Sequence, residues 1–243
     1  MRVSHFILSH PGRRKVNEDY VFPEHVNGHL AQTYVVCDGV GGGNRGDIAS
    51  AMICRSLGHQ LSLADHIDEE AIEEALNEAE TELRNHSTEF PESRGMATTV
   101  VGFHPTSEAE GLVYWVGDSR LYHLRDGEIL FRTKDHSLVQ MMIDNGEITE
   151  EQAEKNSARN VILQAISDSK RQATPEIHRL TDIQSGDRIL LMTDGILEGC
   201  SENQLVELFK GDSKKATSEI RSLCEEKSSD NFSMIAIEIE EGK

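Results

Sequence analysis

The chain has 243 residues, of which 43 are Asp or Glu and 24 are Lys or Arg, so its formal net charge is −19. This excess of negative charge excludes a nucleic-acid groove or an anionic membrane surface, because both need clustered Lys and Arg. The composition, 37% hydrophobic and 28% charged, is that of a folded protein with a substantial core.

The sequence shows no targeting, membrane-spanning or linker segment. Residues 1–11 lack the apolar core of a signal peptide, and no apolar run approaches the roughly 20 residues of a membrane span. The four cysteines include no Cys-x-x-Cys pair, which indicates buried thiols of a reducing compartment (Cys37, Cys54, Cys200 and Cys224). We therefore expect a cytoplasmic monomer that forms a single domain over residues 1–243.

In the first half of the chain, hydrophobic patterning predicts strands over residues 3–8 and 30–37 and helices over residues 47–61 and from Asp68 onward. Asp68 is a suitable N-cap for the second helix. The apolar positions of that helix fall on one stripe, formed by Ile72, Ala75, Leu76, Ala79 and Leu83. Its other face is almost entirely Glu, which indicates a solvated surface.

The second half is richer in strands. Apolar or alternating runs predict strands over residues 97–104, 112–117, 121–124, 129–132, 177–179, 188–192 and 232–239. The pair Asp126-Gly127 predicts a hairpin turn. Helices are predicted near residues 138–145, 150–155, 202–209 and 213–224. Because helices come in pairs between blocks of strands, the sequence predicts an α+β sandwich with the helices outside.

Aspartates stand at the ends of five predicted strands. Asp38 and Asp194 each follow an apolar run and precede a glycine, Asp118 follows a third run, and Asp19 and Asp230 lie just before strands. A single Asp-Gly pair is ordinarily only a turn, but five such aspartates indicate that a rigid sheet presents carboxylates to one point. Oxygen ligands without Cys or His select hard cations, Mg²⁺ or Mn²⁺.

Two further features favour phosphate chemistry. Gly39, directly after Asp38, has no side chain, so its backbone carbonyl can approach a metal closely. Arg13 and Arg14 lie shortly before Asp19, and a guanidinium group matches two phosphate oxygens at once. Two hard cations a few ångströms apart can bridge a hydroxide and bind a phosphoryl group during in-line attack.

Five short motifs together resemble those of the metal-dependent (type 2C) serine/threonine protein phosphatases, in the order of that family. They are residues 14–19 (RKVNED), 36–42 (VCDGVGG), 117–120 (GDSR), 193–195 (TDG) and 230–233 (DNFS). Residues 135–139 and 159–162 look like further signatures of the family's bacterial branch. The resemblance spans nearly the whole chain. It implies an αββα fold, two central and mostly antiparallel β-sheets flanked by pairs of helices.

The resemblance also implies a set of metal ligands for two cations, Mn²⁺ or Mg²⁺. Asp38 would bridge the two ions. Asp194 and Asp230 would hold the first, while Asp19 and the Gly39 carbonyl would serve the second, partly through water. Catalysis would be direct attack of a metal-bound hydroxide on phosphorus, without a phosphoenzyme.

Three further residues receive roles from the same resemblance. Asp118 would help Asp194 to bind a third, weaker ion. Arg14 matches the phosphate-binding arginine of the family. Glu18 is the alternative to Asp19 as a ligand.

Some positions depart from the family's pattern. Val40 and Gly43 replace a Met and a His that are usual in bacterial members; neither is expected to be a ligand, so little effect on the chemistry is expected. Val40 also means that no histidine follows Asp38-Gly39, so the general acid that some eukaryotic members are thought to use is missing and a water would protonate the leaving group. His136 is a distant alternative for that role. The departures at residues 156–157 and 164–167 lie near the flap region and are expected to affect substrate preference, not the metal ligands.

The sequence thus predicts a phosphatase for phosphoserine and phosphothreonine in proteins, which opposes a Ser/Thr kinase. The alternative is a phosphatase-like scaffold or sensor that has lost catalysis, although none of the five carboxylates is lost. Within the family, a phosphatase for phosphoserine on anti-sigma-factor antagonists is a further alternative.

Overall fold

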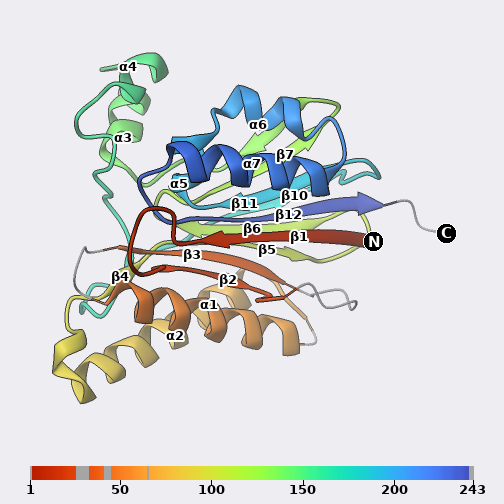
Figure 1. Ribbon diagram of the computed structural model, residues 1–243. Helices are drawn as coiled ribbons and strands as arrows, with labels where there is room; N and C mark the ends of the chain where they lie inside the picture. Colours follow the sequence, from red (N-terminus) through yellow and green to blue (C-terminus); the bar gives the residue numbers. More distant parts are fainter. Residues whose placement is uncertain (1, 26–32, 41–44, 65, 241–243) are drawn as a thin grey trace.

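The computed structural model describes residues 2–25, 33–40, 45–64 and 66–240, and in it two β-sheets pack face to face between layers of helices (Figure 1). The first sheet has five antiparallel strands in the order β1 (Arg2–His10), β12 (Phe232–Glu240), β11 (Arg188–Met192), β7 (Arg120–Arg125) and β8 (Glu128–Arg132). Because β1 pairs with β12 along its whole length, this sheet contains both ends of the described chain.

The second sheet is also antiparallel. Its strand order is β10 (Glu176–Leu180), β6 (Gly111–Val116), β5 (Val100–Pro105), β3 (Tyr34–Val40), β4 (Ala97–Thr98) and β9 (Ile166–Ser167). One more strand, β2 (Asp19–Phe22), pairs with β3.

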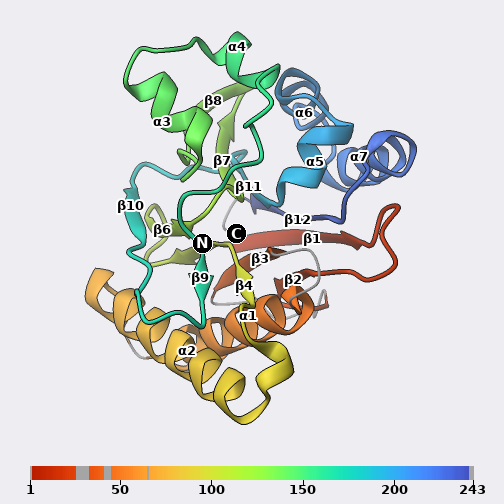
Figure 2. The same cartoon turned by 90° about the vertical axis from the view of Figure 1, so that its left-hand side faces the viewer.

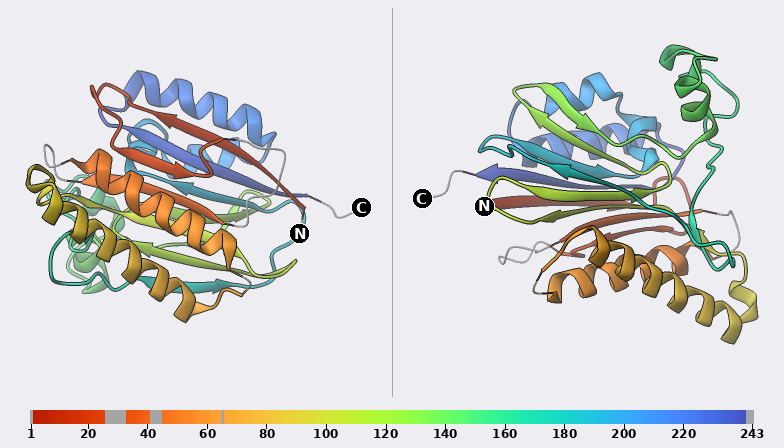
Figure 3. Two further views of the ribbon diagram at one scale, coloured as in Figure 1. Left: turned by 90° about the horizontal axis from the view of Figure 1, so that it is seen from below. Right: turned by 180° about the vertical axis from the view of Figure 1, so that it is seen from behind.

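Helices cover the outer face of each sheet. The long helices α1 (Gly46–Leu63) and α2 (Glu69–Glu89) lie side by side against the second sheet (Figure 3), followed by the short 3-10 turn η1 (Pro91–Ser93). The first sheet is covered by α5 (Asp194–Gly199), α6 (Glu202–Leu208) and α7 (Ser213–Lys227). Two short helices, α3 (Leu138–Asp144) and α4 (Glu150–Glu154), project from one end of the sandwich (Figure 1).

Three apolar layers hold these elements together. The layer between the sheets is built from β-branched and aromatic side chains such as Val36, Val101 and Ile235, all fully buried. A second layer joins α1 and α2 to the second sheet, and a third joins α5, α6 and α7 to the first. The predicted α+β sandwich with two central antiparallel sheets is therefore confirmed.

Local signals read from the sequence are also found in place. Asp68 caps α2, since its carboxylate accepts a hydrogen bond from Ala71 N at 2.9 Å, an interaction worth about 1 kcal/mol. Asp126 and Gly127 both have positive φ, 51° and 78°, as a two-residue hairpin turn requires. All four cysteines are buried free thiols, as predicted. Among the described residues, no helix combines the length and the apolar character needed to cross a bilayer.

The structure corrects the sequence-based boundaries in three places. The strand predicted over residues 97–104 is divided into β4 and β5 at Thr99. At this residue the side-chain hydroxyl accepts a hydrogen bond from the backbone N–H of Asp38. Helix α5 was not predicted, since six residues are too few to show a helical period. The strand predicted over 30–37 is described from Tyr34 to Val40, and residues 30–32 and the glycines at 41–43 lie outside the described residues.

Candidate metal centre

Helices α3 and α4 stand at one end of the sandwich (Figure 2), and residues of these helices line a cavity together with Asp118 and Asp194. Asp19 begins β2 and stands directly opposite Asp38 in the β2–β3 ladder. Side chains of directly opposed residues lie on the same face of an antiparallel pair, about 5 Å apart at Cβ. Two carboxylates that are 19 positions apart in the sequence thus become neighbours through strand pairing.

Asp194 and Asp230 are brought to the same place by the first sheet. Thr193, the residue before Asp194, donates its hydroxyl to Asp19 Oδ2 at 3.0 Å and accepts a hydrogen bond from Ser233 N at 3.0 Å. The start of α5 also lies against the start of β12, where a Cβ on Gly195 would come within 1.9 Å of the Asn231 carbonyl oxygen. This close approach requires glycine after Asp194.

Asp118 lies in the turn between β6 and β7. Gly117 has φ of +106°, and a Cβ there would lie 2.7 Å from Thr99 Cβ, so only glycine fits before Asp118. The hydroxyls of Thr99 and Ser119 are 2.6 Å apart, and Thr99 Oγ1 also accepts a hydrogen bond from Asp38 N at 3.1 Å. Thr99 therefore ties the turn that carries Asp118 to the strand that carries Asp38.

The electrostatics show that these carboxylates act on one another. Burial, followed by the negative charges of Asp194 and Asp230, raises the pKa of Asp19 to about 7, although Ser233 and Thr193 hydroxyls oppose this. Burial and the charge of Asp194 raise the pKa of Asp118 to about 7, and burial and the charge of Asp230 raise that of Asp194 to about 6. The pKa of Asp38 is raised by burial and then by the other four aspartates.

Such a cluster favours a bound cation. Buried like charges destabilise one another unless a proton or a metal ion neutralises them. Asp19 Oδ1 is buried and has no hydrogen-bond partner among the described residues, so this oxygen is available as a metal ligand. The donor set contains carboxylate oxygens only, which matches Mg²⁺ or Mn²⁺.

Within the described part of the chain, no group of three or more His, Cys, Asp or Glu side chains is arranged to hold a metal ion. Mg²⁺ commonly keeps several waters and takes only one or two carboxylates from the protein. Carboxylates that do not all converge on one point can therefore still serve a cation that is held partly through water.

Gly39 and the residues before Asp19 lie at the edge of this cluster. The backbone of Gly39 lies so close to that of Gly46 in α1 that a Cβ on Gly39 would come within 2.4 Å of the Gly46 carbonyl. Gly39 N donates to the Glu18 carbonyl at 3.0 Å, and burial followed by the charge of Asp47 raises the pKa of the Glu18 carboxyl. Glu18 is thus next to the cluster, whereas Asp19 is inside it.

Arg14 reaches the aspartates from the loop between β1 and β2. Its Nη2 donates to Asp230 Oδ2 at 2.8 Å, and about half of its side chain, 54%, is exposed. Arg13 does not share this contact, because its Nη2 donates to the Glu226 carbonyl at 2.5 Å. Of the two arginines, only Arg14 has its guanidinium at the carboxylate cluster.

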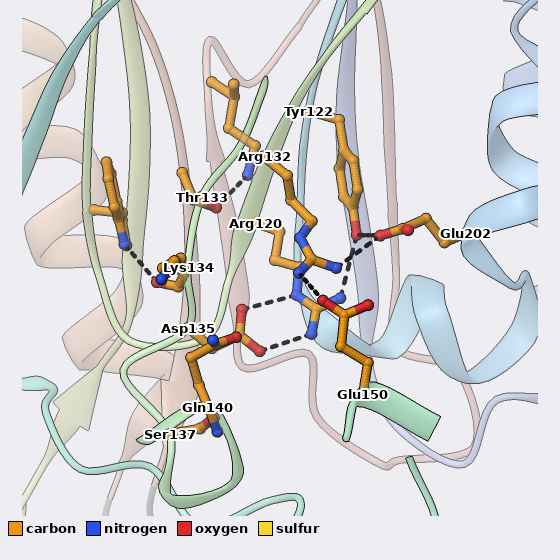
Figure 4. A network of polar contacts seen from close by, with 12 residues as sticks. Arg120, Tyr122, Arg132, Thr133, Lys134, Asp135, Ser137, Gln140, Glu150 and Glu202 are labelled. Atoms are coloured by element: carbon orange, nitrogen blue, oxygen red, sulfur yellow. Dashed lines mark hydrogen bonds and ion pairs between the residues drawn. The ribbon is translucent and has the colours of Figure 1, made fainter. Parts of the chain in front are cut away.

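A cavity of about 660 Å³ opens beside Asp118 and Asp194. Helices α3 and α4 form one wall with Val139, Ile143 and Ala153, and α5 and α6 contribute the opposite side. Several of its lining residues belong to one polar network (Figure 4). It consists of Arg120 bound through two nitrogens to Asp135 at 2.7 and 2.8 Å, Tyr122 donating to Glu202 at 2.9 Å, and Arg132 between Glu202 and Glu150.

Sequence reasoning missed the polar residues that orient the carboxylates. Thr99 and Thr193 each use one hydroxyl to connect two segments that carry aspartates. Asn231 accepts a hydrogen bond from Glu18 N at 2.9 Å and donates to the Pro11 and Val16 carbonyls, which fixes the loop of Arg14. The only available signal was that each of these residues lies next to, or pairs with, a singled-out aspartate.

Comparison with known proteins finds relatives of this chain. A family model described as Protein phosphatase 2C matches residues 8–211. The serine/threonine protein phosphatase PstP of Mycobacterium tuberculosis is 30% identical over 204 residues, which are 81% of this chain and 37% of that protein. The chain thus spans little more than a third of the mycobacterial protein. The serine/threonine phosphatase stp of Listeria monocytogenes is 30% identical over 191 residues, 76% of this chain and 73% of the relative.

Solved structures show the same fold. The crystal structure of the M. tuberculosis phosphatase PstP/Ppp superposes with a TM-score of 0.86 at 25% identity and covers 98% of this chain and 99% of that one. The catalytic domain of PstP in complex with two manganese ions superposes with a TM-score of 0.83, also at 25% identity, over 98% of this chain and 99% of that one.

Proposed function

This chain belongs to the protein phosphatase 2C family, and from that premise we propose that it hydrolyses phosphoserine and phosphothreonine in proteins with the help of Mn²⁺ or Mg²⁺. The observation that carries the proposal is the cluster of buried and half-buried aspartates, in which the pKa values of Asp19, Asp38, Asp118 and Asp194 are raised by burial and by the charges of neighbouring aspartates. A manganese-bound structure of the related PstP domain supports the choice of a divalent cation.

Each carboxylate has a separate task in this proposal. Asp38, whose pKa is raised by all four other aspartates, would be a ligand of both ions. Asp194 and Asp230 would hold the first ion, and Asp19 would serve the second together with the Gly39 carbonyl. When bound, the two ions supply an activated water and neutralise charge on the phosphoryl group. Thr193 keeps one oxygen of Asp19 occupied, so that the unpartnered Oδ1 is directed to the metal.

Asp118 and Arg14 complete the site. Asp118 would serve a third, weaker ion together with Asp194, a role supported by the effect of the Asp194 charge on the pKa of Asp118. Arg14 uses one guanidinium nitrogen on Asp230, and its other donors remain available to phosphate oxygens. Because half of the Arg14 side chain is exposed, a phosphate on a protein surface can reach it.

The cavity beside Asp118 and Asp194 is suited to the polypeptide on one side of the phosphorylated residue. Its volume, about 660 Å³, is that of a site for several side-chain-sized groups. We propose that phosphorylated substrates of a Ser/Thr kinase bind there. The chain acts as one catalytic domain over residues 1–243, because β1 and β12 pair and draw both ends into one sheet.

We also place the protein in the cytoplasm as a monomer. The location is supported by four buried free thiols, which are ordinary in a reducing compartment. Retention of all five carboxylates favours an enzyme over an inactive scaffold or sensor.

The test is release of phosphate from a phosphothreonine peptide over a Mn²⁺ titration, with a chelator as the blank. We expect turnover that requires the metal and is lost in Asp38→Asn. Asp68→Asn is the matched control, since Asn also caps a helix and position 68 is remote from the site. Absence of metal-stimulated turnover, or full activity in Asp38→Asn, would refute the enzyme and leave the scaffold alternative.

A further inference from the structure

His136 lies behind the turn that carries Asp118, and both of its ring nitrogens are engaged. Gly117 N donates to His136 Nδ1 at 3.2 Å, and the side-chain amide of Gln164 donates to the same atom at 2.9 Å. On the other side of the ring, Nε2 lies 3.1 Å from Glu176 Oε1. A neutral imidazole has one N–H, so an accepting Nδ1 places the proton on Nε2, directed to Glu176.

Gln164 fixes this arrangement. Its Nε2 also donates to the Thr174 carbonyl at 2.9 Å, and its Oε1 accepts a hydrogen bond from Thr174 N at 3.3 Å. Exchanging the two ends of the amide would break both of these bonds, so the amide presents a donor to His136. Gln164 therefore orients the His136 ring next to the turn of Asp118, whereas the sequence suggested an effect on substrate preference.

The backbone of His136 connects two segments. Its N donates to the Gly117 carbonyl at 2.8 Å, and its carbonyl accepts a hydrogen bond from Leu163 N at 2.7 Å. The preceding residue, Asp135, binds Arg120 through two hydrogen bonds (Figure 4). Residues 135 and 136 thus hold the turn around Asp118 at both of its ends and attach it to the segment that follows α4.

We propose that His136 is a positioning residue for the third, weaker cation, because it fixes the turn of Asp118 through the N–H of Gly117. This inference rests on the proposed function, since it takes Asp118 as a ligand. His136 does not touch the phosphate and does not serve as the general acid, because its only proton is directed to Glu176 on β10. Partners that orient ligands in this way are worth about 10- to 100-fold in metal affinity or activity.

Two substitutions separate the contributions of the ring nitrogens. In Asn, Oδ1 stands as many bonds from Cα as Nδ1 of His, so His136→Asn keeps an acceptor for Gly117 and Gln164. In Gln, the amide reaches the position of Nε2, so His136→Gln keeps a polar contact with Glu176 and loses the acceptor. His178→Gln is the matched control, because His178 stacks on Phe131 at 4.2 Å.

The experiment is a calorimetric Mn²⁺ titration of the full chain, together with kcat and KM for a phosphothreonine peptide and a thermal melt. We expect His136→Gln to weaken the weakest Mn²⁺ site about tenfold and to lower kcat at a fixed Mn²⁺ concentration without changing KM. His136→Asn and His178→Gln should resemble the wild type, and Asp118→Asn should lack the weakest site. Equal behaviour of His136→Asn and His136→Gln would overturn the proposal.

Two further outcomes are distinguishable. If both His136 variants fail to fold, Gln164→Leu takes their place, because it removes the donor that fixes the ring; an unchanged weakest site in that variant would contradict the inference. If the wild type binds Mn²⁺ but releases no phosphate, the proposed function fails. The difference between His136→Asn and His136→Gln in the titration still decides whether His136 positions Asp118.

Discussion

Thr193 is the residue whose removal gives the sharpest test of how the metal centre is held. Its hydroxyl donates to Asp19 Oδ2 and accepts a hydrogen bond from Ser233 N, each at 3.0 Å, and Thr193 and Ser233 are fully buried. Thr193→Val keeps the shape of the side chain and removes both interactions. The buried Ser233 N–H then loses one acceptor, and Asp19 loses one of the two hydroxyl donors, Ser233 and Thr193, that oppose the rise of its pKa.

The expected loss follows from these two contacts. A buried donor left without its partner costs about 1–3 kcal/mol, and a hydrogen bond to a charged group contributes about 1.5–3 kcal/mol. Since the two effects share one hydroxyl, we expect a total of about 2–4 kcal/mol in the free energy of unfolding. For a chain of this size that corresponds to a fall of roughly 5–15 °C in melting temperature. The affinity for Mn²⁺ should fall about tenfold, because a proton competes more strongly for Asp19.

Thermal melts with and without Mn²⁺, and a Mn²⁺ titration of activity, measure both effects. Thr217→Val is the matched control, because the Thr217 hydroxyl donates only to the Ser213 carbonyl within α7. The control should change stability by less than about 1 kcal/mol and leave the Mn²⁺ response unaltered. The reasoning is refuted if Thr193→Val melts like the control and responds to Mn²⁺ like the wild type.

Three other changes have definite expectations. In the metal-free wild type, the Asp118 carboxyl, with its pKa raised to about 7, stabilises the fold below pH 4 and loses that contribution as the pH rises. Between pH 4 and 7 the free energy of unfolding of Asp118→Asn, measured in urea, should therefore rise by at least about 1 kcal/mol relative to that of the wild type. A difference in unfolding free energy that does not change with pH would contradict this. Arg14→Ala should raise KM for a phosphopeptide about tenfold, while Arg13→Ala should not; equal KM values for the two would exclude Arg14 as the phosphate ligand. Asp187→Asn should cost about 3 kcal/mol of stability and leave kcat unchanged, because the fully buried Asp187 carboxylate binds both His123 and Arg125. The exposed Asp182→Asn should lower the melting temperature much less, and similar losses in the two variants would refute the role of burial.

The sequence alone could predict those parts of the fold that depend on periodic apolar patterning. Strand β12 and helix α2 were found because their apolar side chains repeat at periods of two and of about 3.6 residues. Helix α5 and strand β9 are too short to show any period, and they form because the chain is held there by its neighbours. The prediction was therefore accurate for elements whose stability comes from one continuous buried face.

The candidate site divides in the same way. Asp38 and Asp194 could be recognised because each follows an apolar run and precedes a glycine, a pattern present in consecutive residues. Thr193 and Gln164 could not, because one hydroxyl or amide next to a strand carries no information until the partner strand is placed beside it. Gln164 gains its meaning only from its contacts with His136 and Thr174, which lie 28 and 10 positions away.

The net charge of −19 bears on the order in which ligands bind. A dianionic phosphate is repelled by a cluster of ionised aspartates, and before a metal binds the Arg14 guanidinium is held by Asp230. Under the proposed function, a cation on Asp230 would weaken that ion pair, so the same event would reduce the repulsion and free Arg14 donors for the phosphate. Because binding linkage is reciprocal, phosphate would then raise the affinity for the metal by the same factor. Arg14 and Asp230 would therefore couple the two ligands of the proposed reaction.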